Sequence, residues 1–302
     1  DMLEKYRVRT DLAVENREKF EKDNVEISGV VLHRSEDRER EITTTAVKIE
    51  TDSGARAMGK PKGIYITLEA PNLKVPDRGI HREVSKKLAE QLKKLLPRKR
   101  DSVLVAGLGN RNITPDALGP CAADHLRVTR HIIREYGERA LGDEKTPMIS
   151  AVVPGVMAQT GMETLEILRG VVREIKPDVV LLIDALAARS TKRLNCTIQL
   201  TDTGICPGSG VGNYRCGLNA ETLGVPVIGI GIPTVVDAGT IVHDAVAELL
   251  ESLEDAEIDE FLSELVSPSL REMFVTPKDI DDTISRLSFT LSEGINLALT
   301  FR

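Results

Sequence analysis

Short apolar runs alternate with segments of helical periodicity, and this pattern constrains the fold more than any other feature. Strands are predicted at 103–107, 149–153, 179–184 and 226–232, and helices at about 120–136, 159–175 and 238–253. A strand that is apolar along its whole length must be covered on both faces, as in a parallel sheet between two layers of helices. The sequence therefore predicts a three-layer α/β fold around an open, mostly parallel sheet.

The first part of the chain has a different pattern. Three β-like stretches, at 25–34, 41–50 and 63–71, are separated by charged or Gly/Lys/Pro turns. They predict an N-terminal antiparallel β-meander. Two long helices complete the expected elements: one has Val84, Leu88, Leu92 and Leu95 on a single face and ends at Pro97, and the other spans about 279–299.

Composition excludes several classes of function. The 302 residues are 41% hydrophobic, carry a formal net charge of −7 and contain no tryptophan. An acidic surface does not favour nucleic acid or an anionic membrane as partner. No signal peptide and no apolar run long enough to cross a bilayer is present, so a cytoplasmic protein is expected. The four cysteines lack CxxC spacing, and we expect reduced thiols.

Two aspartates follow the predicted core strands, where an open parallel sheet binds its ligands. The first strand runs into the turn 107–110, which begins like a phosphate loop but leads to Asp116, whose charge would repel phosphate. Asp184 closes the otherwise apolar strand 179–184. We expect the two carboxylates to face one crevice. Such a pair can activate water and protonate a leaving group, or hold a divalent cation.

Each acidic residue also has a structural interpretation. Asp116 lies near a predicted helix start, where aspartate is a favoured N-cap. Asp184 is also compatible with a satisfied buried carboxylate. Asp237 is interpreted as a helix cap, and His125 and His131 as surface or satisfied core residues. A metal-dependent peptidase and a non-catalytic metal binder remain alternatives, with Asp116 and Asp184 as the ligands if any metal is bound.

A glycine-rich loop and two cations are candidates for substrate binding. The loop "GICPGSGVGN" at 204–213 has four glycines, and its Gly208, Ser209 and Gly210 are expected to present backbone amides as oxyanion donors. Arg189 and Lys192 follow Asp184 closely and are candidate pocket residues, although charges on a solvated loop explain them equally well.

Long motifs make a family resemblance recognisable. The segments "VRTDLAVE", "TPDALGP", "IDALAARS", "PGSGVGN" and "GIPTVVDA", in this order, resemble the germination proteases of spore-forming bacteria. The resemblance implies an endopeptidase of the spore core that degrades small acid-soluble spore proteins and forms a homotetramer. It implies a fold similar to that of hydrogenase maturation proteases, and it places the family's proposed catalytic aspartates at Asp116 and Asp184.

The resemblance also implies a zymogen that removes its own N-terminal prosegment. The stretch "TDLAVE" is similar to the Thr-Glu-(Phe/Ile)-Ala-Ser-Glu site that the family cuts in its substrates. We therefore predict that residues 1–11 form a prosegment and that the chain cuts itself between Asp11 and Leu12. Mild acid should favour this cut if the carboxylate pair must share one proton. Within one compact domain, residues 12–80 form the β-rich part and residues 81–302 the peptidase core.

Overall fold

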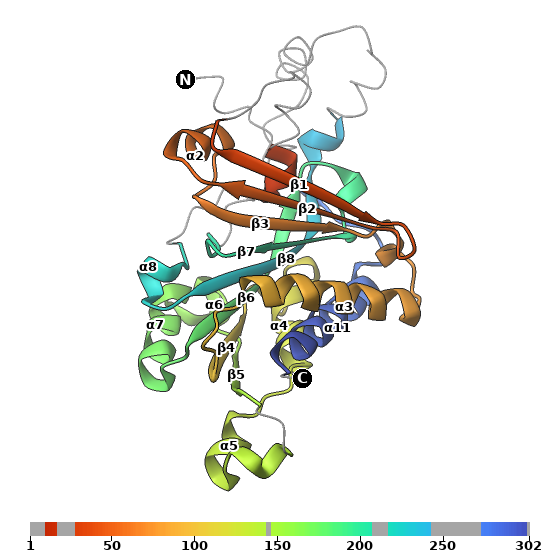
Figure 1. Ribbon diagram of the computed structural model, residues 1–302. Coiled ribbons are helices and arrows are strands. Elements are labelled where there is room, and N and C mark those ends of the chain that lie inside the picture. The colour runs from red at the N-terminus through yellow and green to blue at the C-terminus, as the bar shows by residue number, and fades with distance from the viewer. Residues whose placement is uncertain (1–9, 17–27, 143–145, 207–216, 243–272, 301–302) are drawn as a thin grey trace, which may run out of the picture.

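The computed structural model describes residues 10–16, 28–142, 146–206, 217–242 and 273–300 (Figure 1). The strands are β1 (Val30–Asp37), β2 (Ile42–Ile49), β3 (Gly63–Glu69), β4 (Ser102–Gly107), β5 (Met148–Val152), β6 (Val179–Ala188), β7 (Thr197–Thr201), β8 (Val227–Asp237) and β9 (Phe274–Val275). The helices are α2 (Asp52–Met58), α3 (Arg78–Leu95), α4 (Leu118–Asp124), α5 (Arg130–Tyr136), α6 (Met157–Thr160), α7 (Thr164–Ile175), α8 (Ala220–Leu223) and α11 (Ile280–Leu299).

Within these residues the strands form a single nine-stranded sheet in the order β1-β2-β3-β7-β8-β6-β4-β5, with β9 added to β8. Strands β5, β4, β6 and β8 pair in parallel, as the apolar runs predicted. The meander β1-β2-β3 is antiparallel and joins the parallel part through β7. The α/β class with an antiparallel N-terminal part is confirmed. The sheet also runs continuously across the boundary predicted at residue 80.

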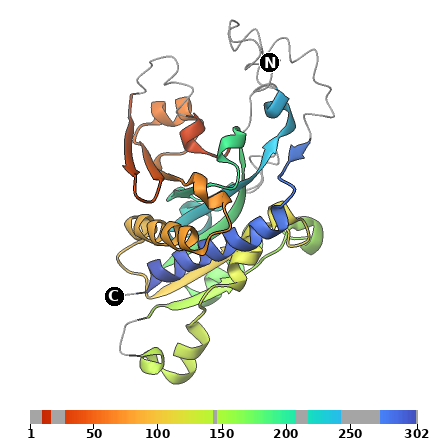
Figure 2. The ribbon, with the colours of Figure 1, turned by 90° about the vertical axis from the view of Figure 1, so that its right-hand side faces the viewer.

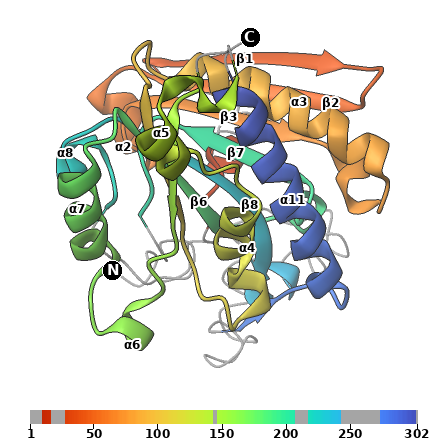
Figure 3. The ribbon, with the colours of Figure 1, turned by 90° about the horizontal axis from the view of Figure 1, so that it is seen from below.

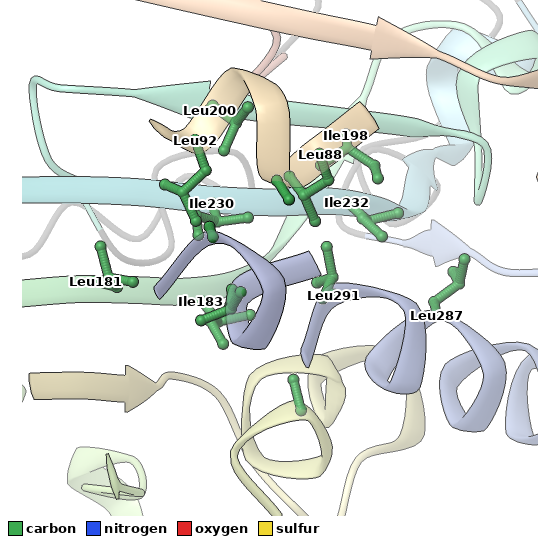
Figure 4. Close-up of a cluster of buried hydrophobic side chains, with 14 of the residues drawn as sticks. Leu88, Leu92, Leu181, Ile183, Ile198, Leu200, Ile230, Ile232, Leu287 and Leu291 are labelled. Atoms are coloured by element: carbon green, nitrogen blue, oxygen red, sulfur yellow. The ribbon is translucent and has the colours of Figure 1, made fainter. Parts of the chain in front are cut away.

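Helices cover both faces of the parallel strands. Alternate residues of β6 explain why: Leu181 and Ile183 belong to the core beneath α3, α4 and α11, whereas Val180 and Leu182 belong to the core beneath α7. Figure 3 shows α7 on one side of the parallel strands and α4 and α11 on the other. The larger core combines side chains from α3, α11 and strands β6, β7 and β8 (Figure 4).

Helices α3 and α11 lie side by side over this core (Figure 2). Asp77 caps α3 by accepting a hydrogen bond from Ile80 N at 3.0 Å, and the helix ends just before Pro97. On α11, a Cβ at Gly294 would lie 2.6 Å from Leu88 Cδ2, so glycine permits the close approach of the two helices.

The single helix predicted at 120–136 is wrong, because the structure divides it into α4 and α5. Thr129 lies at the break and is tied to the start of β5. Its backbone N donates to Ile149 O at 3.0 Å, and its hydroxyl donates to Pro147 O and accepts from Ile149 N. The helix predicted at 159–175 is likewise divided into α6 and α7 at Gly161, whose φ is +71°. Most of the helix predicted at 238–253 lies outside the described residues.

Candidate active site

The glycine turn after β4 folds back on the segment that carries Asp116. Gly109 has a φ of +111°, and a Cβ there would lie 2.0 Å from the backbone oxygen of Asp116. A Cβ at Gly107 would lie 2.2 Å from Gly119 O. The glycines therefore allow two backbone segments to come into direct contact around Asp116.

Asp116 ends a short 3₁₀ turn, Thr114–Asp116, rather than capping a helix. Its Oδ2 accepts a hydrogen bond from Asn110 N at 2.7 Å. The N-cap residue of α4 is Ala117, without a side-chain cap, so the interpretation of Asp116 as a cap is wrong. Strand β8 supports the turn, because the Thr234 hydroxyl donates to Pro115 O at 2.7 Å. Asp237, by contrast, does cap the following helix by accepting from Thr240 N at 3.0 Å.

Asp184 is 7% exposed and lies on β6 beside the glycine turn. Leu108 N donates to Ile183 O at 2.8 Å, and Asp184 Oδ1 accepts from Ala185 N at 3.0 Å. Burial raises the pKa of Asp184 well above its usual range, and the negative charges of Asp116 and Asp11 raise it further, against a smaller lowering effect of the Ala185 N–H. The structure thus brings Asp116 and Asp184 together, and it adds a third carboxylate.

That third carboxylate belongs to the N-terminal segment, residues 10–16. Asp11 N donates to Ala187 O at 3.0 Å, and Ala187 N donates to Asp11 Oδ2 at 2.9 Å. The chain therefore pairs with β6 only three residues beyond Asp184. Leu12 and Val14 are buried in a cluster with side chains of β6 and β8, and Ala13 is buried against side chains of β2 and β3.

Two side chains hold the peptide around the Asp11–Leu12 bond. The carbonyl oxygen of Asp11 accepts from Lys60 Nζ at 2.8 Å and from Gln199 Nε2 at 3.0 Å. Gln199 Oε1 accepts from Ala13 N at 2.7 Å. Burial lowers the pKa of the Lys60 ammonium, against raising effects from Asp11, Cys206 and Glu15.

Glu15 anchors the other end of the segment and is 2% exposed. Its carboxylate accepts from the backbone N of Arg189 at 2.8 Å and of Ser190 at 3.1 Å, and from the Thr10 hydroxyl. The Arg193 guanidinium lies 3.5 Å from it and also binds Glu69 at 2.9 Å.

These contacts place the predicted substrate-binding residues. Arg189 contributes its backbone N–H to the Glu15 carboxylate, and Lys192 is exposed. Gly208, Ser209 and Gly210 lie outside the described residues. The sequence reasoning missed Arg193, Lys60 and Gln199. Arg193 directly follows Lys192, which the sequence did suggest as a pocket residue. The local sequence around Lys60 and Gln199 contains no signal that separates them from ordinary turn and strand residues.

Other sequence expectations concern metals, thiols and membranes. In the part of the chain that the structure describes, no three His, Cys, Asp or Glu residues gather closely enough to hold a metal ion. Cys121, Cys196 and Cys206 are free thiols, and Cys216 lies outside the described residues. His125 and His131 are exposed. None of the described helices combines the length and apolar character needed to cross a bilayer.

Comparison with known proteins identifies the family. Residues 8–253 match the Peptidase_A25 family, described as germination protease. The germination protease of Caldanaerobacter subterraneus subsp. tengcongensis is 47% identical over 310 residues, covering 97% of this chain and 94% of the relative. That of Clostridium perfringens is 43% identical over 314 residues, covering 97% and 95%. That of Geobacillus sp. is 38% identical over 358 residues, covering 98% and 95%.

Among solved structures, the NiFe hydrogenase maturation protease HycI from Thermococcus kodakarensis KOD1 aligns with a TM-score of 0.36 and 17% identity, covering 68% of this chain and 98% of that chain. The sequence relatives are much closer and align along almost their whole length. On the family match and these relatives, the chain belongs to the germination protease family of peptidases.

Proposed function

We propose that this protein is a self-processing endopeptidase that cuts after an acidic residue and before an apolar one. One observation carries the proposal: the Asp11–Leu12 bond, which has this character, is docked on β6 beside Asp184. The family resemblance supplies the wider role, which is to initiate the degradation of small acid-soluble spore proteins in the spore core. It also supplies the expected homotetramer.

The two aspartates take different roles in the proposed reaction. Asp184, whose pKa is raised by burial and by the charges of Asp116 and Asp11, supplies a proton in this reaction. Asp116, which is half-exposed and held by Asn110 N, acts as the base. Asp116 takes a proton from a water molecule as the water oxygen attacks the carbonyl carbon of Asp11. The C=O electron pair moves to the oxygen. When it returns, the C–N bond breaks and the Leu12 nitrogen takes the proton of Asp184.

The metal-dependent alternative leads to a different reaction. A divalent ion would activate the water as a Lewis acid, and Asp116 and Asp184 would be its ligands. Incubation with a chelator distinguishes this reaction from the two-aspartate mechanism.

The first test is self-processing of the wild-type chain. Incubation in mild acid is expected to yield a new N-terminus at Leu12, at the same rate with and without a chelator. N-terminal sequencing and intact mass at successive times measure both quantities. A new terminus at another residue contradicts the processing site. Loss of cleavage in the chelator supports the metal-dependent peptidase, and no cleavage in any condition supports a binder.

The Glu15 site leads to a prediction about substrate choice. Besides the Thr10 hydroxyl, three donors after β6 surround this carboxylate, four residues after the cut. A substrate acid at that place is therefore expected to bind in the same way. Hydrogen bonds to a charged group contribute about 1.5 to 3 kcal/mol, so its loss should lower kcat/KM by about 10 to 100-fold.

Two peptides that differ only in this residue, Thr-Glu-Ile-Ala-Ser-Glu and Thr-Glu-Ile-Ala-Ser-Gln within the same flanking sequence, provide the comparison. Steady-state cleavage by the chain that begins at Leu12 gives kcat/KM for each peptide. Equal values would mean that the Glu15 site does not select substrates.

A further inference from the structure

The carbonyl oxygen of Asp11 accepts hydrogen bonds from two side chains, Lys60 and Gln199. Two donors at one carbonyl oxygen can contribute to catalysis of the cleavage of that peptide bond. We propose that Lys60 and Gln199 bind the carbonyl of the bond to be cut and stabilise the negative charge that develops on its oxygen. The inference rests on the proposed function and deepens it. It names two side chains as oxyanion donors, whereas the predicted donors Gly208, Ser209 and Gly210 lie outside the described residues.

The register of the sheet places Gln199 on the same face as Asp184, two strands away. Asp184 on β6 pairs with Gly231 on β8, and Gly231 pairs with Gln199 on β7. Paired residues project from the same face, and two strand spacings separate Asp184 from Gln199 by about 10 Å. The central residue, Gly231, makes room for the side chain of Leu186, because a Cβ there would lie 2.6 Å from Leu186 Cγ. Asp184 and Gln199 therefore lie on the same face of the sheet, on either side of Gly231.

The orientation of the Gln199 amide follows from its partners. A backbone N–H only donates and a carbonyl only accepts, so the oxygen must face Ala13 N and the nitrogen must face Asp11 O. One buried side chain thus grips the peptide on both sides of Leu12. This grip orients the Asp11 carbonyl relative to the sheet.

Lys60 reaches the same oxygen from the meander. Helix α2 ends at Gly59, whose φ of +60° is left-handed, and Lys60 N donates to Ala55 O at 3.2 Å. The turn directs the Lys60 side chain inwards to Asp11 O. An ammonium in the interior is costly. A peptide carbonyl offers it only a partial negative charge, whereas the tetrahedral intermediate offers a full one. The contact therefore strengthens as the water oxygen adds to the carbonyl carbon, which is the requirement for catalysis.

The test compares variants that remove one donor each. Lys60→Met and Gln199→Leu are expected to slow cleavage of the Asp11–Leu12 bond by about 10² to 10³-fold, the usual cost of losing one oxyanion donor. Lys62→Met is the matched control, because Lys62 is exposed and pairs with Asp52 at 2.7 Å. Time courses of N-terminal release measure the first-order rate, and urea unfolding checks that each variant is folded.

A second measurement separates catalysis from mere anchoring of the N-terminal segment. The chain that begins at Leu12 is assayed with the Thr-Glu-Ile-Ala-Ser-Glu peptide. Loss of an oxyanion donor lowers kcat, whereas loss of an anchor raises KM. Lys60→Arg, which retains a cation, should recover part of kcat.

Wild-type self-processing rates in both variants, or a rise in KM with unchanged kcat, would overturn the inference. Asp184→Asn is measured in parallel. If it stops cleavage while Lys60→Met and Gln199→Leu do not, only this inference fails. If Asp184→Asn also cleaves normally, the proposed function itself fails.

Discussion

Replacing Asp184 by asparagine is expected to slow cleavage of the Asp11–Leu12 bond by about 10² to 10⁴-fold, the usual contribution of a positioned general acid. Asparagine has nearly the same shape, and its Oδ1 can still accept the hydrogen bond from Ala185 N. It lacks the acidic proton that the Leu12 nitrogen needs when the C–N bond breaks. Asp116→Asn is expected to cause a loss of similar size, because no carboxylate then takes the proton from water.

The matched control is Asp124→Asn. Asp124 is exposed on α4 and forms a salt bridge with Arg111, so its loss removes one surface charge near the site without touching the pair. Mass spectrometry of the released N-terminal peptide gives the rate for each variant. Because the two aspartates act as a unit, the double variant should be hardly slower than either single variant. Full activity of Asp184→Asn would remove Asp184 from the mechanism.

The parts of this site that the sequence predicts are those that local pattern determines. Four nearly continuous apolar strands required a covered parallel sheet, and Asp184 was conspicuous because it closes the predicted strand 179–184. Asp116 was conspicuous because an acid follows a glycine turn. Since both strands belong to the parallel part of the sheet, their carboxyl ends were expected to meet, and they do.

The missed parts depend on contacts between distant segments. Strand β7 has the sequence Thr-Ile-Gln-Leu-Thr, and it was not recognised because its polar residues do not resemble a core strand. Its central Gln199 is a buried ligand for a segment almost two hundred residues earlier in the chain. Lys60 looks like an ordinary turn lysine until the fold brings the carbonyl of Asp11 to it. Likewise, the break between α4 and α5 reflects hydrogen bonds from Thr129 to β5.

Self-processing is also expected to accelerate as the pH falls from neutral into mild acid. The proposed general acid must carry a proton, and the raised pKa of Asp184 extends its protonated state upwards from the ordinary range near 4. Above that raised pKa, the cleavage rate should fall about tenfold for each pH unit, as the protonated fraction does.

Asp116 and Asp11 are the charged groups that act on Asp184, so the observed pKa belongs to the three carboxyl groups together. Initial rates from neutral pH downwards measure the profile. A rate that rises with pH through this range would contradict the assignment of Asp184 as the acid.

Stability provides a second measure of the same proton that does not depend on cleavage. Asp116→Asn is the background, because its self-processing is expected to be slow. Burial and the charge of Asp11 still raise the pKa of Asp184 in this variant.

The folded state of the variant binds the Asp184 proton more tightly than the unfolded chain does. Asp184 therefore lowers the free energy of unfolding as the pH rises from about 4 through its folded pKa. Asp116→Asn/Asp184→Asn lacks this loss. Its advantage in the free energy of unfolding, measured by urea titration, should therefore grow across that window by about 1.4 kcal/mol for each unit of raised pKa and level off above it. An advantage that is the same at every pH would mean that Asp184 holds no extra proton, and the pH profile of cleavage would need another source.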